Sequence, residues 1–247
     1  MKLASVEIRS AAEMLINILE GKASALQEMG TAIMLSGGVD SSLLFSIYGR
    51  KVVPFTLFHG KSADLEEARF LCSYLDRDLV EIEITKDEIM EAAAAIKHID
   101  PSASIIEISF EIPFYVACNR IPQERIMTGQ GADEIFYGYG KFRDGREDSN
   151  RISLETLRNK TLPREIMISS AFGKVPLMPY MDEEIIREFS SIPRVEHMNQ
   201  EYNKIIVRKA CEIMGIPERI YNRPKKAAQY GSGIMKVLRE FRGEINT

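Results

Sequence analysis

A glycine- and serine-rich segment constrains the fold of this chain more than any other feature. Residues 36–42 read Ser-Gly-Gly-Val-Asp-Ser-Ser, follow the apolar run 32–35 and precede the apolar stretch 43–48. Gly37 and Gly38 let the backbone approach a ligand closely. Free N–H groups at a helix N-terminus, together with serine hydroxyls, favour a bound anion. The segment therefore predicts a strand, a phosphate-binding turn and a helix, and an ordinary serine-capped turn is the alternative.

Asp40 is unexpected in such a segment, because a carboxylate repels phosphate. A bridging Mg²⁺ removes the conflict, since Mg²⁺ accepts both carboxylate and phosphate oxygens as ligands. Residues 36–42 do not match the P-loop pattern G-x-x-x-x-G-K-[ST]. A different kind of nucleotide-binding turn is therefore expected.

The composition is typical of a globular protein and excludes several partner classes. The 247 residues are 45% hydrophobic and 28% charged, with a net charge of −4. This balance gives no global basic field for nucleic acid or an anionic membrane, and no apolar run approaches the ~20 residues of a membrane span. The N-terminus does not resemble a signal peptide, so we expect a cytoplasmic protein. Without a C-x-x-C pair, Cys72, Cys118 and Cys211 are expected to be buried free thiols.

Apolar patterns along the chain alternate between strand-like and helix-like segments. Strands are predicted over residues 31–35, 52–58, 79–84 and 125–128. Helices are predicted over residues 6–29, 39–49, 64–75, 86–97 and 105–120, with an interruption near Pro113. The alternation predicts an α/β fold with a doubly wound parallel sheet of about five strands. Ligands of such sheets bind beyond the carboxyl ends of the strands, so the loops after residues 35, 58 and 128 should converge.

We expect one domain over residues 1–247, with an N-terminal helical segment over 1–30 and an α/β core over 31–140. The strand signal disappears after residue 140, so 141–247 is predicted to be mostly helical. The charged residues 141–151 are predicted to form a mobile surface loop. One helical face fits either the core or a homodimer interface, and it comprises Val207, Ala210, Ile213 and Met214.

A second glycine-containing segment, 128–139, reads Thr-Gly-Gln-Gly-Ala-Asp-Glu-Ile-Phe-Tyr-Gly-Tyr. Gly129 would let the backbone approach a nucleotide, and Asp133 and Glu134 lie at the start of the next helix, where acids are stabilised. Asp133 is thereby a candidate second ligand for the Mg²⁺ at Asp40. The alternative is an acid-capped helix.

Taken in order, these motifs resemble those of the synthetase domain of the asparagine synthase family, which belongs to the N-type ATP pyrophosphatases and is also found in β-lactam synthetases. Residues 36–42 resemble the pyrophosphate loop, and 129–139 resemble the second signature. Arg-Pro-Lys-Lys-Ala at 223–227 resembles the third element, a basic C-terminal loop. Residues 176–182 resemble the family's R-V-P-F-L-D segment. The resemblance covers about residues 31–240 and implies an adenine nucleotide α-hydrolase-like fold.

The resemblance implies a Mg-ATP-dependent ligase that adenylates a small-molecule carboxylic acid, aspartate or an analogue. Pyrophosphate leaves, and ammonia or an amine then displaces AMP. Asp133 would be the second magnesium ligand, and Leu35, Phe58 and Gly129 would neighbour the adenine. The residues that would hold pyrophosphate and Mg²⁺ are Ser36, Gly37, Gly38, Asp40, Ser41 and Ser42.

The resemblance also assigns a catalytic cation to the C-terminal loop. Lys225 would neutralise charge on the α-phosphate in the transition state. The alternative is that Lys225 and Lys226 belong to a solvated basic loop. Residues 176–182 are expected to be structural, with Asp182 capping a helix over 183–189.

Two positions differ from the family pattern. Lys2 stands where glutamine-using members carry a catalytic cysteine, and only about 30 residues precede the glycine-rich loop. The sequence is therefore expected to use free ammonia or an amine, or to depend on a separate glutaminase subunit. Gln130 replaces a glutamate that assists the nitrogen nucleophile. Glutamine cannot act as a base near neutral pH, so Gln130 leaves the product undetermined.

Two other function classes stay open. Some ATP pyrophosphatases adenylate a tRNA base, although the lack of a basic patch and of C-x-x-C pairs disfavours a nucleic-acid substrate here. A non-catalytic, nucleotide-binding subunit of a separate amidotransferase is the third interpretation. The intact phosphate-binding motif disfavours it.

Overall fold

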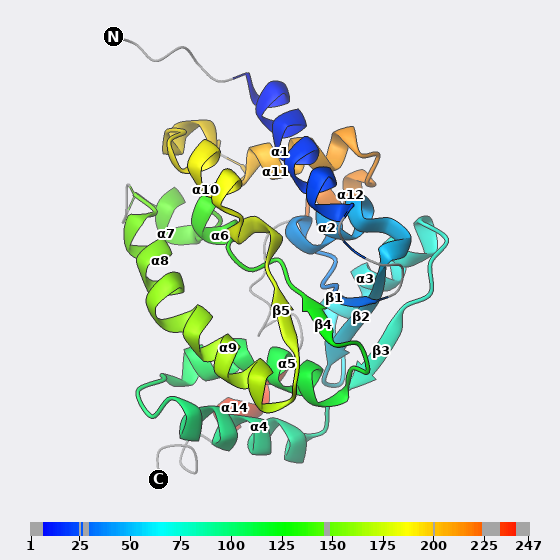
Figure 1. The fold of residues 1–247 in the computed structure, drawn as a ribbon, viewed down its shortest axis with the longest axis vertical. Coiled ribbons are helices and arrows are strands. Elements are labelled where there is room, and N and C mark those ends of the chain that lie inside the picture. Colours follow the sequence, from blue (N-terminus) through cyan, green and yellow to red (C-terminus); the bar gives the residue numbers. More distant parts are fainter. Residues whose placement is uncertain are drawn as a thin grey trace.

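One parallel β-sheet forms the centre of the computed structural model, which describes residues 7–24, 26, 30–145, 149–199, 201–223 and 233–240 (Figure 1). The strand order is β3-β2-β1-β4-β5, and every neighbouring pair is parallel. The strands are β1 Thr31–Met34, β2 Val52–Phe58, β3 Val80–Glu83, β4 Arg125–Met127 and β5 Val175–Leu177. The predicted α/β fold with a five-stranded parallel sheet is therefore confirmed.

Helices cover both faces of this sheet (Figure 1). Ala32 and Ile33 of β1 belong to two different hydrophobic clusters, because successive side chains of a strand point to opposite faces. The cluster around Ile33 includes α1 Ile8–Ala23, α2 Val39–Tyr48, α3 Ala63–Tyr74, α10 Glu183–Ser190, α11 Ile205–Ile213 and α12 Glu218–Tyr221. The cluster around Ala32 includes α4 Lys86–Ile99, α5 Ile105–Arg120, α9 Leu162–Ala171 and α14 Ile234–Glu240.

Short helical elements connect these layers. They are the 3₁₀ turns η1 Gly49–Lys51, η3 Pro179–Met181 and η4 Arg194–Glu196, the π-helical turn η2 Leu157–Thr161, and the helices α6 Ala132–Ile135, α7 Gly140–Arg143 and α8 Arg151–Thr156. Most of the predicted elements agree with the observed ones to within a few residues at each end.

The strand order places a switch point between β1 and β4, where the chain turns to opposite sides of the sheet. The loops after these two strands meet there, because a Cβ on Gly129 would lie 3.1 Å from Cβ of Asp40. The segment after β2 is linked to the same region by Arg223, which donates hydrogen bonds to Ser36 O and Asp64 Oδ1. The expected approach of the loops after β1 and β4 is thus confirmed, at the place where such sheets bind ligands. Arg223 joins the start of α3 to the loop after β1.

Three expectations about local structure are wrong. The chain returns to the sheet after residue 140, because β5 pairs with β4 at the sheet edge, where Pro176 is tolerated. Helix α5 continues through Pro113, and its start is fixed by a capping box between Ser104 and Glu107. Part of the predicted loop over 141–151 is helical, since α7 extends to Arg143 and α8 begins at Arg151.

The structure also places the cysteines and one face of α11. All three cysteines are buried free thiols. Val207 and Ala210 are core residues, and Ile213 and Met214 are partly buried and pack against the same core, so this face of α11 contributes to the core. No helix in the described part of the chain is long and apolar enough to cross a membrane.

His197 is a fully buried histidine in the aromatic part of the core. Its ring centroid lies 5.8 Å from that of Phe136 and 5.0 Å from that of Tyr137. Burial lowers the pKa of His197 from 6.5 to about 4, because a charged imidazolium would lose its hydration there. The folded protein therefore holds this side chain neutral at pH values where the unfolded chain protonates it.

This pKa difference predicts a loss of stability in mild acid. Below pH 6.5 the unfolded state binds a proton at His197 that the folded state does not, so stability falls as the pH decreases towards 4. The contribution is about 2 kcal/mol between pH 8 and pH 5. We expect His197→Phe to lose less unfolding free energy over this range in urea titrations than wild type or the exposed control His98→Phe. An equal loss in His197→Phe would contradict the assignment.

Candidate functional site

The glycine-rich loop after β1 is packed too closely to accept side chains at its first glycine. Gly37 has a φ of +65°, and a Cβ there would lie 2.3 Å from Cβ of Glu67 in α3. Helix α2 begins after Gly38, which offers no side-chain cap, so its first N–H groups form a positive helix end. This geometry fits the predicted anion-binding turn.

Three serines surround the same turn. Ser36 Oγ lies 3.3 Å from Ser41 Oγ and accepts a hydrogen bond from Gly38 N at 3.3 Å. Ser42 Oγ is buried and makes no hydrogen bond within the described residues. The five loop residues predicted to hold phosphate, together with Asp40, therefore lie in one contiguous turn.

The two predicted magnesium ligands converge on one cation that the sequence did not predict. Lys204 Nζ lies 2.5 Å from Asp40 Oδ2 and 2.6 Å from Asp133 Oδ1. The Lys204 side chain is only 2% exposed. Burial alone would lower its pKa, but Asp133 and Asp40 outweigh burial and raise the pKa above its usual value. Lys204 is therefore a charged ammonium between two carboxylates.

The sequence carries little signal for this role of Lys204. The residue precedes α11 and has a φ of +58°. This is a left-handed backbone conformation that residues other than Gly, Asn and Asp seldom adopt. A lysine before a helix is normally a solvated residue. The position becomes informative only when Asp40 and Asp133 are known to be its neighbours.

The second glycine-containing segment is shaped around this ion-pair cluster. A Cβ on Gly138 would lie 1.8 Å from Asp133 Oδ1 and 2.2 Å from Lys204 Cε. Tyr180 supports the other side, because its hydroxyl donates a hydrogen bond to Asp40 O at 3.1 Å. This contact favours the predicted structural role of residues 176–182. Asp182 accepts a hydrogen bond from Glu184 N at the start of α10, which confirms the predicted cap.

The carboxylate pair fits a magnesium ion chemically. Asp40 Oδ1 is buried without a hydrogen-bond partner among the described residues, so this oxygen is available to a cation. No group of three or more metal-ligating side chains occurs in the described ranges. Mg²⁺ commonly binds one or two carboxylates and completes its shell with phosphate oxygens and water. Asp40 and Asp133 therefore suit Mg²⁺ bound to a nucleotide.

Three further residues were predicted to lie near the adenine or the nitrogen donor, namely Leu35, Phe58 and Gln130. Leu35 is fully buried, and its backbone N donates to Phe55 O, so its side chain belongs to the core. Phe58 ends β2 and is half-buried, as is Gln130, whose N donates to Thr128 Oγ1 at 3.4 Å. Their roles near the adenine and the nitrogen donor stay predictions.

Lys225 and Lys226 lie outside the described residues. The described residues that flank them lie at the site. Arg223 donates a hydrogen bond to Ser36 O at 3.2 Å. A Cβ on Gly233 would lie 2.4 Å from His59 O, just beyond β2. The two ends of this C-terminal segment therefore adjoin the loops after β1 and β2.

Comparisons with known proteins show what this chain is similar to. The family model described as asparagine synthase matches residues 23–172 and 151–246. The chain is 30% identical over 255 residues to "Putative asparagine synthetase [glutamine-hydrolyzing] 1" of Methanocaldococcus jannaschii, covering 83% of this chain and 46% of that protein. It is 25% identical over 230 residues to "Asparagine synthetase [glutamine-hydrolyzing]" of Zea mays, covering 82% and 39%. The chain thus spans less than half the length of either relative.

A solved structure resembles the chain over most of its length. The NMN synthetase of Francisella tularensis aligns with a TM-score of 0.48 and 14% identity, covering 96% of this chain and 87% of that one.

The close contact at Gly138 predicts a strong effect of one methyl group. Gly138→Ala must displace the Asp133 carboxylate or the Lys204 side chain, and overpacking of this kind costs about 1–3 kcal/mol. Gly140→Ala is the matched control, because a Cβ there has nothing within 4 Å. We expect urea titrations to show a lower unfolding free energy for Gly138→Ala only. Equal stability of the two variants would contradict the described packing.

Removal of the Lys204 charge tests whether the carboxylate pair binds a metal. Lys204→Met leaves Asp40 and Asp133 facing each other without a cation, at a cost of about 3 kcal/mol. We expect millimolar MgCl₂ to raise the melting temperature of Lys204→Met more than that of wild type. Lys209→Met, which removes a half-buried lysine paired with Glu212, is the control and should respond like wild type. Equal responses of all three proteins would contradict the metal assignment.

Proposed function

Because this chain belongs to the asparagine synthase family, we propose that it is a Mg-ATP-dependent ligase that forms AMP and a carbon–nitrogen bond. In this reaction a substrate carboxylate attacks the α-phosphorus of ATP and pyrophosphate leaves. Ammonia or an amine then attacks the acyl-adenylate and releases AMP. The observation that carries the proposal is the convergence of the glycine-rich loop, Asp40 and Asp133 at the switch point of the sheet.

The loop residues perform the phosphate half of this reaction. The backbone of Gly37 and Gly38 approaches the leaving pyrophosphate closely, because no side chain stands in the way. The N-terminus of α2 stabilises the negative charge. Ser36, Ser41 and Ser42 donate hydroxyl hydrogen bonds to the phosphate oxygens. These groups are fixed before the substrate binds, so little reorganisation accompanies pyrophosphate release.

The carboxylates of Asp40 and Asp133 hold the magnesium ion in this proposal. The ion, when bound, would offset the charge of the pyrophosphate. Lys204 keeps the two carboxylates together and supplies a buried positive charge beside them. Lys225 is proposed to act from the C-terminal loop on the α-phosphate. After Asp40 and Asp133 are balanced, the two lysines and the metal would offset part of the charge of the triphosphate.

Fewer observations bear on the acid substrate and the nitrogen donor than on the nucleotide. Aspartate or an analogue is the proposed acid, in keeping with the family. We propose that the nitrogen donor is ammonia or an amine, which is supplied free or by a separate glutaminase subunit. Gln130 can orient the donor by hydrogen bonding but does not accept its proton.

Exchange of pyrophosphate into ATP tests the adenylation half-reaction without any nitrogen donor. We expect labelled pyrophosphate to enter ATP only when a suitable acid from a panel that includes aspartate is present. Asp40→Asn and Asp133→Asn should each slow this exchange about 100-fold or more, since both remove charge that holds the metal. Asp78→Asn, an exposed control, should exchange at the wild-type rate. Undiminished exchange in Asp40→Asn would sink the metal assignment, and ADP instead of AMP as the product would exclude this ligase class.

A further inference from the structure

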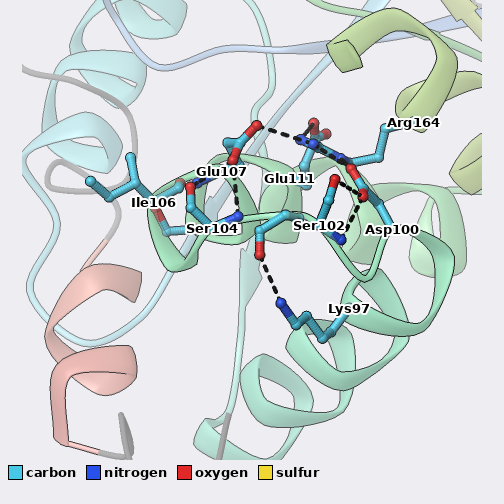
Figure 2. A network of polar contacts seen from close by, with 10 residues as sticks. Lys97, Asp100, Ser102, Ser104, Ile106, Glu107, Glu111 and Arg164 are labelled. Atoms are coloured by element: carbon cyan, nitrogen blue, oxygen red, sulfur yellow. Dashed lines mark hydrogen bonds and ion pairs between the residues drawn. The ribbon is translucent and has the colours of Figure 1, made fainter. Parts of the chain in front are cut away.

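Buried arginines hold two different parts of this molecule together. Figure 2 shows the first, Arg164 in α9, whose side chain is 2% exposed. It donates hydrogen bonds to three carboxylates, those of Asp100, Glu107 and Glu111. These bonds join α9 to α5 and to the residue that ends α4, so they serve the packing of helices. The second arginine, Arg223, donates to the main chain of the nucleotide site.

Arg223 joins the loop after β1 to the start of α3. Its Nη1 donates a hydrogen bond to Ser36 O at 3.2 Å, and its Nη2 donates to Asp64 Oδ1 at 3.1 Å. The side chain of Arg223 is 15% exposed and that of Asp64 is 9% exposed, so salt screens this ion pair little. A guanidinium is a rigid planar fork, and two of its nitrogens bound at once fix the relative position of their partners. Arg223 therefore determines where Ser36 O lies relative to α3.

A further arginine fixes the main chain of Arg223 itself. Arg208 in α11 is 8% exposed, and its Nη1 donates a hydrogen bond to Arg223 O at 3.2 Å. Its Nε donates to Asn203 O at 2.8 Å. Asn203 directly precedes Lys204, whose ammonium contacts Asp40. One guanidinium therefore sets the spacing between the backbone before Lys204 and the backbone at Arg223.

These contacts close a ring around the glycine-rich loop. Lys204 holds the loop at Asp40, and Arg223 holds it at Ser36, on the other side of the two glycines. Helices α11 and α12 pack against α2, the helix that begins in this loop (Figure 1). Glycines have little conformational preference of their own. The conformation of the loop therefore depends on the two positively charged side chains that hold its ends.

The hydrogen bond to Ser36 O also fixes the direction of the next N–H group. The trans peptide between Ser36 and Gly37 is planar, so the N–H of Gly37 points away from the carbonyl of Ser36. Because Arg223 binds that carbonyl, the N–H is directed away from the guanidinium. Gly37 has a φ of +65°, and glycine adopts positive and negative φ about equally readily. Without Arg223, the sequence at Gly37 alone would not fix the direction of this N–H.

We propose that Arg223 is a positioning residue for pyrophosphate release, and that it acts through the peptide between Ser36 and Gly37. This inference rests on the proposed function, because it concerns the same phosphate-binding loop. In adenylation a carboxylate oxygen bonds to the α-phosphorus, the bond from that phosphorus to the bridging oxygen breaks, and pyrophosphate leaves with the electron pair. The N–H of Gly37 faces the negative charge that grows on the pyrophosphate. Such a donor stabilises the transition state when its direction is fixed beforehand.

Binding of magnesium pyrophosphate to the full chain tests this role without turnover. Calorimetry should give a dissociation constant about tenfold higher for Arg223→Gln than for wild type, since one hydrogen bond to a charged group loses its direction. Arg223→Lys keeps the charge beside Asp64 without the planar fork, so its value should lie between the two. Arg219→Gln is the matched control and should bind like wild type, because Arg219 is exposed and pairs with Glu67 of the same helix α3. Equal affinity of wild type and Arg223→Gln would overturn the proposal.

A second variant separates the contact with the loop from the contact with α3. Asp64→Asn removes the ion pair but leaves Ser36 O as a partner of Arg223, so its affinity for pyrophosphate should fall less than that of Arg223→Gln. An equal loss in the two variants would overturn the role at the loop and make Arg223 an anchor of α3. Urea titrations show whether each variant is folded, and Arg223→Lys replaces Arg223→Gln in the comparison if the latter does not fold.

Acid-dependent exchange of pyrophosphate into ATP separates this inference from the proposed function. The maximal exchange rate should fall about tenfold or more in Arg223→Gln, and the pyrophosphate concentration for half-maximal exchange should rise. A merely structural role would reduce the fraction of active protein and leave that concentration unchanged. Wild-type exchange kinetics in Arg223→Gln would overturn the positioning role and leave the ligase. Pyrophosphate binding that depends on Arg223, without exchange in wild type, would retain the role at the loop and overturn the ligase.

Discussion

The contact between Lys204, Asp40 and Asp133 holds the candidate site together. The three side chains come from the starts of α11, α2 and α6, which are far apart in the sequence. In a partly buried environment two carboxylates without a cation would repel each other strongly. Lys204 therefore fixes the relative position of the loops after β1 and β4, and α11 is anchored to both. Its left-handed backbone indicates that the surrounding packing determines the conformation of Lys204 more than its own preference does.

Close backbone packing is the second constraint, and it explains why much of the site was readable from sequence. Gly37, Gly129 and Gly138 each lie where a side chain would meet Glu67, Asp40 or Asp133. Such contacts require glycine, so the sequence pattern of glycines next to polar residues indicates where the site lies. The parallel strands could also be predicted, because buried strands appear in the sequence as short apolar runs. The loop after β1 and the carboxylate pair could therefore be predicted, and their approach at the sheet edge followed from the topology.

The features that were missed depend on tertiary contacts. Strand β5 has three residues and includes Pro176, so its pattern is too short to recognise without β4 beside it. Helix α5 contains Pro113 in its interior, and burial against α4 and α9 together with its capping box outweighs the local cost. Lys204 looks in the sequence like an ordinary lysine before a helix. Only its burial between Asp40 and Asp133, which the sequence does not reveal, distinguishes it from a solvated residue.

The distribution of charge around the glycine-rich loop suits the phosphate half of the proposed reaction. The glycine-rich loop, the start of α2 and Lys204 present positive potential, which suits phosphate oxygens. On the α5 and α9 side, Asp100, Glu107 and Glu111 share the single guanidinium of Arg164. A ligase of the proposed kind must bring an anionic nucleotide and a basic nitrogen donor to one carbonyl carbon. The positive groups at the glycine-rich loop offer a place for the nucleotide, and Asp40 and Asp133 lie beside it on either side of Lys204.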